Sequence, residues 1–554
     1  MKNKMNYREI IELSIFIMFI IFLQLLPNKS MRTDYKVDHS SYIENPHSIR
    51  DKADKSLIIG VDSLNMNLNP FYDKNKDVGL ISRLLNPSLV YRKADGSWDL
   101  DLASEFWYEN DGRTLVFRLK EVYFNDGRLL SADDVVTTYK VLADPKYEGI
   151  HVDYVEKIRG SYDYGRGTNP YDFGVVAHGS DLVKFHFNFY DKKNISYLDF
   201  PIVNTSQLGY KYNDLAQVKN FEATDGAGLF KLDGVGKDNS ISLVKKDWEE
   251  AKEIDFDQII FKSGLYFKII EDYKKGQVDL VYKYNKNSDI MALLTDRTFT
   301  YTRPIENQQG TYSFLGFNMR DSIFSDRDMR RALANSLSLE KYNNIYYGKG
   351  NHYLAQTPVY RNSYLYNDQV KLVKEGSLSS LLEERYGSDR PKEIRMISSK
   401  NNDYIKTIGD YMVEDLAREG LILKIDYLQE ADLFDRVYME GDYDIFAYQR
   451  YMIESPNLAN QFIFNINDEL NISADPNWSI INQLERSSYF ISDQERKSLV
   501  DSWQEYFTED IPYLITNTPL EISLINNRIE NIHINEFGGI ENKEKLKNIK
   551  IVLN

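Results

Sequence analysis

The residues that could carry catalytic or metal chemistry are few and widely spaced. No two of the seven histidines stand three or four residues apart, so the helix-borne histidine pair of an H-E-x-x-H metal site is missing; they occupy positions 39, 47, 151, 178, 186, 352 and 533. The absence of cysteine excludes disulfides, thiolate metal ligands and a cysteine nucleophile. No G-x-S-x-G elbow, phosphate-binding loop or G-x-G-x-x-G fingerprint occurs. The sequence therefore predicts no catalytic residues, no metal site and no cofactor.

Other residues that could bind a ligand or transfer protons have simpler structural interpretations. Adjacent carboxylates such as Asp133-Asp134 are frequent in this acidic chain, and nothing in the sequence brings two of them face to face as general acid and base. Gly226-Ala227-Gly228 predicts a tight turn. Aromatic residues are unusually numerous, with 41 Tyr, 28 Phe and 5 Trp. Most of them must form core, and the remainder suit a cleft that holds an organic ligand against flat rings.

The length and charge of the chain limit its class. With 554 residues, of which 42% are hydrophobic, the chain exceeds the size of a single core, so we expect two or more lobes. Its 84 acidic residues against 68 basic ones disfavour a nucleic-acid partner or an anionic membrane surface.

The N-terminus has the order of charged and apolar residues that is typical of an export signal. Lys2, Lys4 and Arg8 precede an apolar run from Leu13 to Leu26. No pair of small residues follows at the usual cleavage spacing, so the run is either a signal peptide or an uncleaved anchor, although it is shorter than the roughly 20 residues that span a bilayer. A buried helix of the fold is a third interpretation. We assign 1–30 to the signal or anchor and 31–54 to a polar linker.

From Lys55 onward the sequence predicts a mixture of short strands and helices. Leu57 to Val61 is a brief apolar run, and Leu115 to Leu119 alternates like a half-buried strand. Ser131 is placed as the N-cap of a helix whose first turn is acidic.

A clearer unit lies in the C-terminal half. Strands and helices alternate there as β-α-β-α-β, over 393–397, 403–419, 422–427, 431–439 and 443–448. The first helix carries apolar residues at helical spacing and stops at Gly420. Such a run predicts a right-handed, mostly parallel sheet, and ligands of these sheets bind outside the carboxyl ends of the strands. Position 449 onward is therefore a candidate site.

An ordered series of motifs then resembles the extracellular solute-binding proteins of family 5, which are the peptide-binding and nickel-binding subunits of ATP-driven importers. The resemblance covers roughly residues 55 to 535. It rests on Leu89-Val90-Tyr91, Asp95-Gly96, Leu102 to Trp107, Asp111 to Thr114, Phe117 to Leu119, Phe124 to Gly127, Ser131 to Val135, Gly226 to Leu232, Gly276 to Asp279, Leu315 to Asn318, Phe324 to Leu333 and Glu509 to Pro512.

The resemblance implies an α/β fold of the periplasmic-binding-protein-like type II, with two lobes, a hinge and an additional inserted domain. Lobe I would be discontinuous, the insertion would follow its first segment, and lobe II would contain the β-α-β-α-β run. The implied ranges are 55–85, 206–310 and 515–554 for lobe I, 86–205 for the inserted domain and 311–514 for lobe II. The hinge would lie at the two chain crossings near 306–311 and 512–517. Asn318 and Arg330 are expected to be structural.

The ligand segment departs from the family pattern. In peptide binders of the family, a tryptophan and then an aspartate that pairs with the ligand ammonium follow the last strand of the run. Here Arg450 stands at the tryptophan position and Met452 or Ile453 at the aspartate position. Glu454 could replace the aspartate, and Arg450 could instead grip a carboxylate or phosphate. The plainer alternative is a surface salt bridge between them.

We predict the ligand-binding residues from both lobes. The segment Asp62, Ser63, Leu64 and Asn65 matches the first-strand segment that lines the cleft in relatives, although an ordinary strand-end turn would look similar. The predicted set is Asp62, Ser63, Leu64, Asn65, Arg450, Tyr451 and Glu454.

These features lead to three functional hypotheses. The first is a non-enzymatic solute-binding component of an ABC importer that captures peptides by hinge closure. The second is a binder of a non-peptide solute, either anionic or a chelated metal, and the third is an extracellular hydrolase. The expected partners are the ligand and the permease and ATPase subunits of the transporter, with the protein itself a monomer. We expect it on the extracellular face of the cytoplasmic membrane or in the periplasm, and not as a cysteine-anchored lipoprotein.

Overall fold

The computed structural model divides the chain into two units, Met1–Pro46 and His47–Asn554. The described residues are 55–61, 68–73, 76–93, 98–149, 151–190, 192–238, 240–286, 290, 294, 301–308, 310–320, 322–361, 363–451, 493–534, 540 and 543–552. The predicted signal or anchor and linker, Asp62 to Asn65 and Glu454 lie outside them. No helix within the described ranges is long and apolar enough to cross a membrane.

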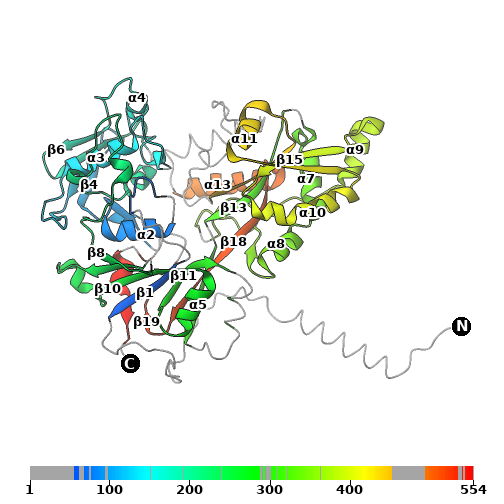
Figure 1. The fold of residues 1–554 in the computed structure, drawn as a ribbon. Coiled ribbons are helices and arrows are strands. Elements are labelled where there is room, and N and C mark those ends of the chain that lie inside the picture. Colours follow the sequence, from blue (N-terminus) through cyan, green and yellow to red (C-terminus); the bar gives the residue numbers. More distant parts are fainter. Residues whose placement is uncertain are drawn as a thin grey trace, which may run out of the picture. The chain divides into compact units, whose positions relative to one another are not determined.

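A single sheet of twelve strands organises the described part of the chain (Figure 1). The strand order is β16-β15-β17-β13-β18-β11-β1-β10-β9-β8, and β12 and β14 also pair with β18. The strands are β1 (Ser56–Val61), β8 (Phe230–Val235), β9 (Ile241–Lys245), β10 (Gln258–Ser263), β11 (Leu280–Asn285), β12 (Thr302–Gln308), β13 (Thr311–Phe317), β14 (His352–Tyr353), β15 (Glu393–Ser399), β16 (Ile422–Leu428), β17 (Ile445–Tyr451) and β18 (Tyr513–Asn526).

Two stretches of the long strand β18 pair with different strands of this sheet. Its residues Tyr513–Asn517 pair with β13, and its residues Leu520–Asn526 pair antiparallel with β12. β14 pairs with the two residues between these stretches. We call β1, β8–β12 and the C-terminal stretch of β18 the β1 half, and β13, β15–β17 and the N-terminal stretch of β18 the β15 half. The two halves are thus joined through β18 and through the short connection between β12 and β13.

Both halves bury apolar side chains on both faces of the sheet. In β1, Leu57 and Ile59 belong to one core cluster and Ile58 to another, as expected when successive side chains point to opposite faces. In the β15 half, Phe314 and Leu315 are divided in the same way. A strand that is covered on both faces has a continuous run of apolar residues in its sequence. This explains why apolar and polar residues do not alternate in β1.

Helices cover the two faces of the twelve-stranded sheet. Two short strands and several single turns complete this part of the chain. The helices are α2 (Lys76–Leu85), α5 (Tyr266–Lys274), α7 (Arg327–Ser336), α8 (Leu339–Tyr347), α9 (Leu378–Tyr386), α10 (Asp403–Arg418), α11 (Glu430–Asp435), α13 (Asp493–Asp510) and α14 (Lys543–Asn548). A two-stranded sheet joins β19 (Ile529–Glu530) to β20 (Lys550–Ile551). The turns are η5 (Glu250–Glu253), η7 (Ile323–Ser325), η8 (Gly387–Asp389) and η9 (Arg436–Glu440), the last of which is π-helical.

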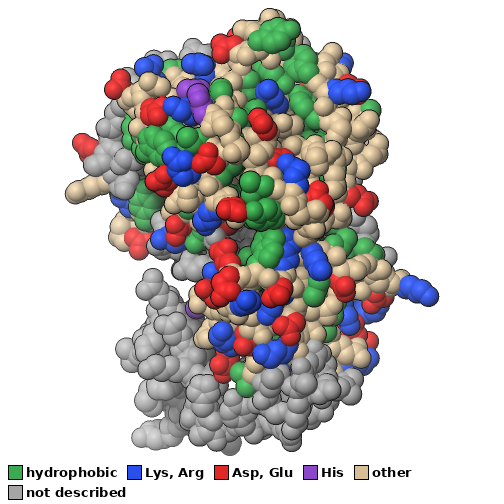
Figure 2. Space-filling model, turned by 90° about the vertical axis from the view of Figure 1, so that its left-hand side faces the viewer, with side chains coloured by type: hydrophobic (Ala, Val, Ile, Leu, Met, Phe, Trp, Pro, Cys, Tyr) green, Lys and Arg blue, Asp and Glu red, His purple; other side chains and the backbone are tan. Residues whose placement is uncertain are grey.

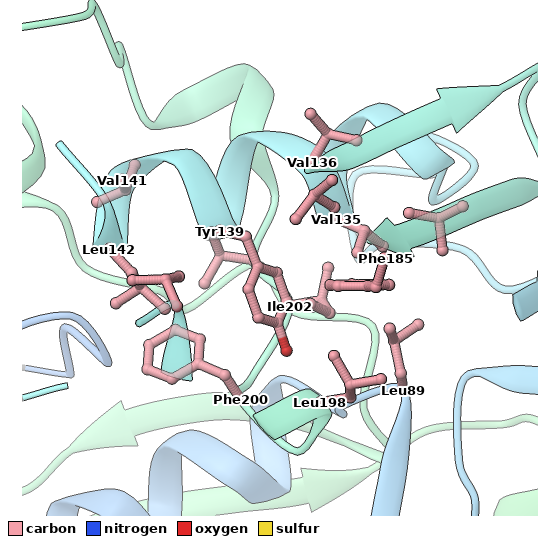
Figure 3. Packing of buried hydrophobic residues seen from close by; sticks show 14 of the residues in the cluster. Leu89, Val135, Val136, Tyr139, Val141, Leu142, Phe185, Leu198, Phe200 and Ile202 are labelled. Carbon is pink, nitrogen blue, oxygen red and sulfur yellow. The ribbon is translucent and has the colours of Figure 1, made fainter. Parts of the chain in front are cut away.

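The segment between β1 and β8 builds a separate core. Its antiparallel sheet has the order β4-β5-β7-β6, and a hairpin joins β2 to β3. Tyr139 packs edge-on against Phe185 at a centroid distance of 5.0 Å, and Leu89, Leu198 and Phe200 lie around them (Figure 3). Its elements are β2 (Val90–Arg92), β3 (Trp98–Leu100), β4 (Ala103–Glu109), β5 (Thr114–Leu119), α3 (Ala132–Leu142), η1 (Val152–Tyr154), α4 (Ser161–Arg166), β6 (Val175–His178), β7 (Leu182–His186), η2 (Lys192–Leu198), η3 (Thr205–Gln207) and η4 (Val218–Asn220).

The predicted β-α-β-α-β unit is confirmed as β15-α10-β16-α11-β17. β15 pairs parallel with both β16 and β17. α10 buries Tyr404, Ile408, Met412 and Leu416 on one face, as their spacing predicted, and the chain leaves the helix through Gly420 with a φ of +75°. The prediction for the last strand was wrong at both ends. The strand starts at Ile445 and continues through Tyr451, because β13 supplies backbone partners for three more residues than its apolar run indicated.

Candidate functional site

The carboxyl ends of parallel strands define the candidate site in each half. β10 and β11 run parallel to β1, and β16 and β17 run parallel to β15. In sheets of this kind, ligands bind outside those ends. The described residues that directly follow them are Gly264 after β10, Lys286 after β11, Lys400 after β15 and Gln429 after β16. The structure thus gives two candidate edges, one in each half.

Two of the predicted ligand residues lie on the edge of the β15 half. Arg450 is paired through the backbone with Tyr312, and Tyr451 with Thr311. Both are therefore residues of β17 itself, whereas the sequence placed them on the loop that follows the strand. Regular pairing with β13 fixes the backbone of these two residues.

The middle of β18 carries a short polar segment that sequence reasoning missed. Thr516, Asn517 and Thr518 are at most 1% exposed. The Asn343 amide donates to the carbonyl of Thr516 (2.7 Å), and the Tyr347 hydroxyl donates to Asn517 Oδ1 (3.2 Å). Within the described ranges, Thr516 Oγ1, Asn517 Nδ2 and Thr518 Oγ1 have no hydrogen-bond partner. Buried polar atoms without a partner require an explanation. Because these three residues lie on β18, which the two halves share, the atoms lie where the halves join.

Aromatic rings surround this segment. The Tyr404 hydroxyl donates to the carbonyl of Thr516 (3.3 Å), and its ring stacks on Tyr347 at 6.1 Å. Burial is the main effect on the Tyr404 phenol and raises its pKa. Tyr404 is therefore a neutral hydrogen-bonding group throughout the physiological pH range.

Two ion pairs lie where β11 reaches β12 and β18. Lys283 Nζ is 3.6 Å from Glu521, and their side chains are 8% and 3% exposed. Lys286 Nζ is 2.5 Å from Glu306 Oε2, and it also donates to the carbonyl of Gly350 (2.8 Å) on the connection between α8 and β14. The second lysine thus ties the end of β11 to a segment that follows β13 in the chain. No motif in the sequence pointed to these four charged residues, because their partners lie far apart along the chain.

The motif residues near Ser131 are structural. Arg128 makes two bonds to the Asp134 carboxylate, at 2.7 and 2.9 Å, and a third to Asn204. The hydroxyl of Thr205 and the backbone N–H of Ser131 complete the shell around Asp134. Burial raises the pKa of Asp134, but the bonds from Arg128 and Thr205 hold it below its usual range. This network fixes the start of α3 to the loop before η3.

Asn318 and Arg330 are structural, as predicted. The Asn318 amide donates to the carbonyls of Gly441 and Tyr443, both at 2.9 Å. The buried guanidinium of Arg330 binds the Asp510 carboxylate (2.9 Å) and four backbone carbonyls. These contacts hold the connections of the β15 half together. The side chains of Asn318 and Arg330 are thus engaged in structural hydrogen bonds.

Gly226-Ala227-Gly228 packs against the end of α2. The N–H of Gly228 donates to the carbonyl of Leu85 (2.7 Å), and Lys246 Nζ donates to the carbonyl of Gly226 (2.8 Å). Burial lowers the pKa of Lys246 to about 7. The lysine thus anchors the chain where it enters β8.

No metal cluster marks a further site in the described part of the chain. No group of three or more His, Asp or Glu residues there could hold a metal ion. On the face shown in Figure 2, the coloured basic and acidic side chains are interspersed with hydrophobic ones. The described side chains on that face form no extended basic field of the kind that nucleic-acid binding requires.

Comparison with known proteins then decides the family. Residues 98–468 match the model of the "Bacterial extracellular solute-binding proteins, family 5 Middle". The chain belongs to this family. Its fold is therefore the α/β fold of the type II periplasmic binding proteins with an additional domain, as predicted, and its biochemical class is solute binding outside the cytoplasm. No match was found among the curated proteins.

Solved structures show the same fold over nearly the whole chain. A putative peptide-binding protein AppA from Clostridium difficile has a TM-score of 0.73 at 16% identity, with 89% of this chain and 100% of that chain covered. The oligopeptide-binding protein AppA from Bacillus subtilis, solved with a nonapeptide, has a TM-score of 0.66 at 18% identity, with 90% and 99% covered. The binding protein AgaA from A. tumefaciens R10, solved with agropinic acid, has a TM-score of 0.65 at 18% identity, with 90% and 99% covered.

Proposed function

We propose that this family 5 protein captures a peptide between its two halves and presents it to the permease of an ABC importer. The observation that carries the proposal is the sheet itself. Its two sets of parallel strands end in two candidate edges, and within the described ranges the backbone passes from one set to the other through β18 and the short β12–β13 connection. Two halves linked this narrowly can rotate about the joint, and a ligand that contacts both edges favours the closed state.

The proposal includes the domain division inferred from the sequence. Lobe I would comprise 55–85, 206–310 and 515–554, the inserted domain 86–205, and lobe II 311–514. The separate core between β1 and β8 supports an inserted domain, although its members extend from Phe71 to Ala227. The change of partners along β18, between Asn517 and Leu520, supports a hinge at this crossing.

The proposed ligand contacts are those that the sequence predicted. Asp62, Ser63, Leu64 and Asn65 follow β1 directly in the chain, and Arg450 and Tyr451 end β17. Glu454 follows three residues later. A peptide supplies an ammonium group, a carboxylate and backbone amides, so it can use charged and neutral polar partners from both edges.

The same proposed contacts also suit a second class of ligand, an anionic solute. Arg450, in place of the aromatic residue typical of peptide binders, would suit the carboxylate of an anionic solute. The AgaA structure with agropinic acid shows that this fold accommodates a ligand outside the peptide class. A binder of an anionic or chelated-metal solute is therefore the second candidate.

The proposal extends to location and partners. The protein would act as a monomer outside the cytoplasmic membrane, held there by an uncleaved Leu13–Leu26 segment or released after cleavage. It would bind the permease of an importer that an ATPase drives. It would release its ligand chemically unchanged, as a transport component and not an enzyme.

Thermal denaturation with defined peptide pools tests the peptide proposal. A ligand at a hundred times its dissociation constant adds about 2.7 kcal/mol to the free energy of unfolding, so a binding pool should raise the melting temperature. A pool of small organic anions serves as the comparison. A shift with anions and none with any peptide pool would replace the peptide proposal by the second candidate. Recovery of cleaved peptides by mass spectrometry would refute the non-enzymatic role.

A further inference from the structure

The first turn of α5 lies at the candidate edge of the β1 half. β10 runs parallel to β1 and ends at Ser263, and Gly264 alone separates its carboxyl end from Leu265, where α5 begins. α5 packs closely on β1, since a Cβ on Gly60 would lie 2.5 Å from Ile269 Cγ2 on the helix. The start of α5 is thus fixed beside the strand ends outside which ligands of such sheets bind.

Two large apolar side chains at the start of α5 are exposed. Leu265 is 69% exposed and Phe267 is 63% exposed. Further along the helix, the exposed positions are the charged residues Lys268 and Glu271, and the buried positions are apolar or aromatic. The exposed apolar surface of α5 is therefore confined to the turn that meets the candidate edge.

Leu265 also stands where a polar capping residue is favoured. It is the N-cap of α5, the position at which Ser, Thr, Asp and Asn side chains accept a hydrogen bond from the first turn. The first turn then contains Lys268, although the helix dipole favours acidic residues there. Departures of this kind from local stability rules are expected at functional sites. An apolar side chain at the edge thus takes the place of a cap that would stabilise the helix.

We propose that Leu265 and Phe267 form an apolar subsite for a hydrophobic side chain of the bound peptide, an inference that rests on the proposed function. A peptide side chain that lies against this turn would remove apolar surface of both partners from water, which favours binding. Because the subsite consists of two side chains on an open turn, it would select for hydrophobic character and not for one particular side chain. The ligand class that it assigns is a peptide with at least one aliphatic or aromatic side chain.

Two tetrapeptide libraries of the form Ala-X-X-Ala test this preference. In the apolar library X is Leu, Val or Phe, and in the polar library X is Ser, Thr or Asn, so both libraries have the same length and termini. Each library is offered to the full chain, and the retained peptides are measured by native mass spectrometry. The unaltered protein should retain the apolar library about five-fold more strongly or better, because covering half of one Leu or Phe side chain changes an affinity by roughly that factor.

Leu265→Ser separates recognition from folding, because its two expected effects have opposite signs. Serine restores an N-cap, so the melting temperature should be unchanged or higher. The variant should nevertheless retain the apolar library about 3- to 10-fold more weakly and the polar library as before. Phe267→Ser should weaken retention of the apolar library by a similar factor. Val235→Thr changes an exposed apolar residue at the end of β8 in the same half and should keep the preference.

The outcomes distinguish failure of the subsite from failure of peptide capture. Equal retention of the two libraries by the unaltered protein would overturn the inference and leave peptide capture standing, as would undiminished retention of the apolar library by both serine variants. An equal loss for both libraries in these variants would also overturn it, since the two side chains would then contact the opposite half and not the ligand. Retention of neither library by the unaltered protein would refute peptide capture itself, together with the inference that depends on it.

Discussion

The buried amine of Lys246 predicts an unusual dependence of stability on pH. The side chain is 7% exposed, donates to the carbonyl of Gly226 and lies 3.9 Å from the centroid of the Trp248 ring. Burial lowers its pKa from 10.5 to about 7, with a smaller opposing effect from Asp225 and a smaller lowering effect from Lys231. Folding therefore favours the neutral amine over a wide range of pH.

The sign and size of the effect follow from this pKa. Between pH 7 and 10.5 the unfolded chain keeps the proton on Lys246 and the folded chain has released it, so the free energy of unfolding rises with pH. Below pH 7 both states carry the proton, and the full cost of burying the charge is present. At 1.36 kcal/mol for each pKa unit, the rise across the window is about 5 kcal/mol, and about half of it falls between pH 7 and 9.

Urea denaturation at a series of pH values from 6 to 10 measures this rise. Other groups titrate in the same range, so the informative quantity is the difference between the protein and Lys246→Met. The variant should lose about 2–3 kcal/mol of the increase between pH 7 and 9. Lys231→Met removes an exposed lysine from the neighbouring strand and should keep the increase. Parallel curves for the protein and Lys246→Met would refute the reasoning, because the buried lysine would then titrate as it does in the unfolded chain.

The remaining predictions concern residues of the family motifs. Arg330→Met should lower the free energy of unfolding by about 3–5 kcal/mol, because it leaves a buried carboxylate and four carbonyls without their donor. Arg385→Met removes an arginine from the surface and should leave the stability in the same urea titration nearly unchanged. Gly228→Ala should cost about 1–3 kcal/mol, since its Cβ would lie 2.2 Å from the carbonyl oxygen of Leu84, whereas Gly234→Ala meets nothing within 4 Å and should be nearly neutral by thermal denaturation. A cost for Gly234→Ala equal to that for Gly228→Ala would contradict the packing argument.

Much of the local structure could be predicted because its causes are local. The apolar spacing of α10 and its stop at Gly420 predicted the helix to within one residue. The capping pattern at Ser131 predicted the start of α3, where the N–H of Ser131 donates to the Asp134 carboxylate. The end of β17 could not be predicted in this way. Its last residues are held in the strand by backbone pairing with β13, which lies more than a hundred residues earlier in the chain. Apolar patterning records which residues are buried, not which strand supplies their backbone partners.

The residues of the candidate edges were harder to predict than the fold, because the family motifs do not include them. The motifs that revealed the family consist of residues such as Asn318, Arg330 and Asp134, which bind backbone groups and polar neighbours of their own domain. Such residues identify the scaffold and say little about its ligand. The predicted contacts Arg450 and Tyr451 were placed by analogy with the family, and their role stays a prediction.

The buried charges of the β1 half are brought together only by long-range strand pairing. Lys283 and Glu521 are separated by 238 positions, and β18 makes them neighbours only because it passes from β13 to β11 and β12. The motifs that define the fold therefore do not reveal this pair.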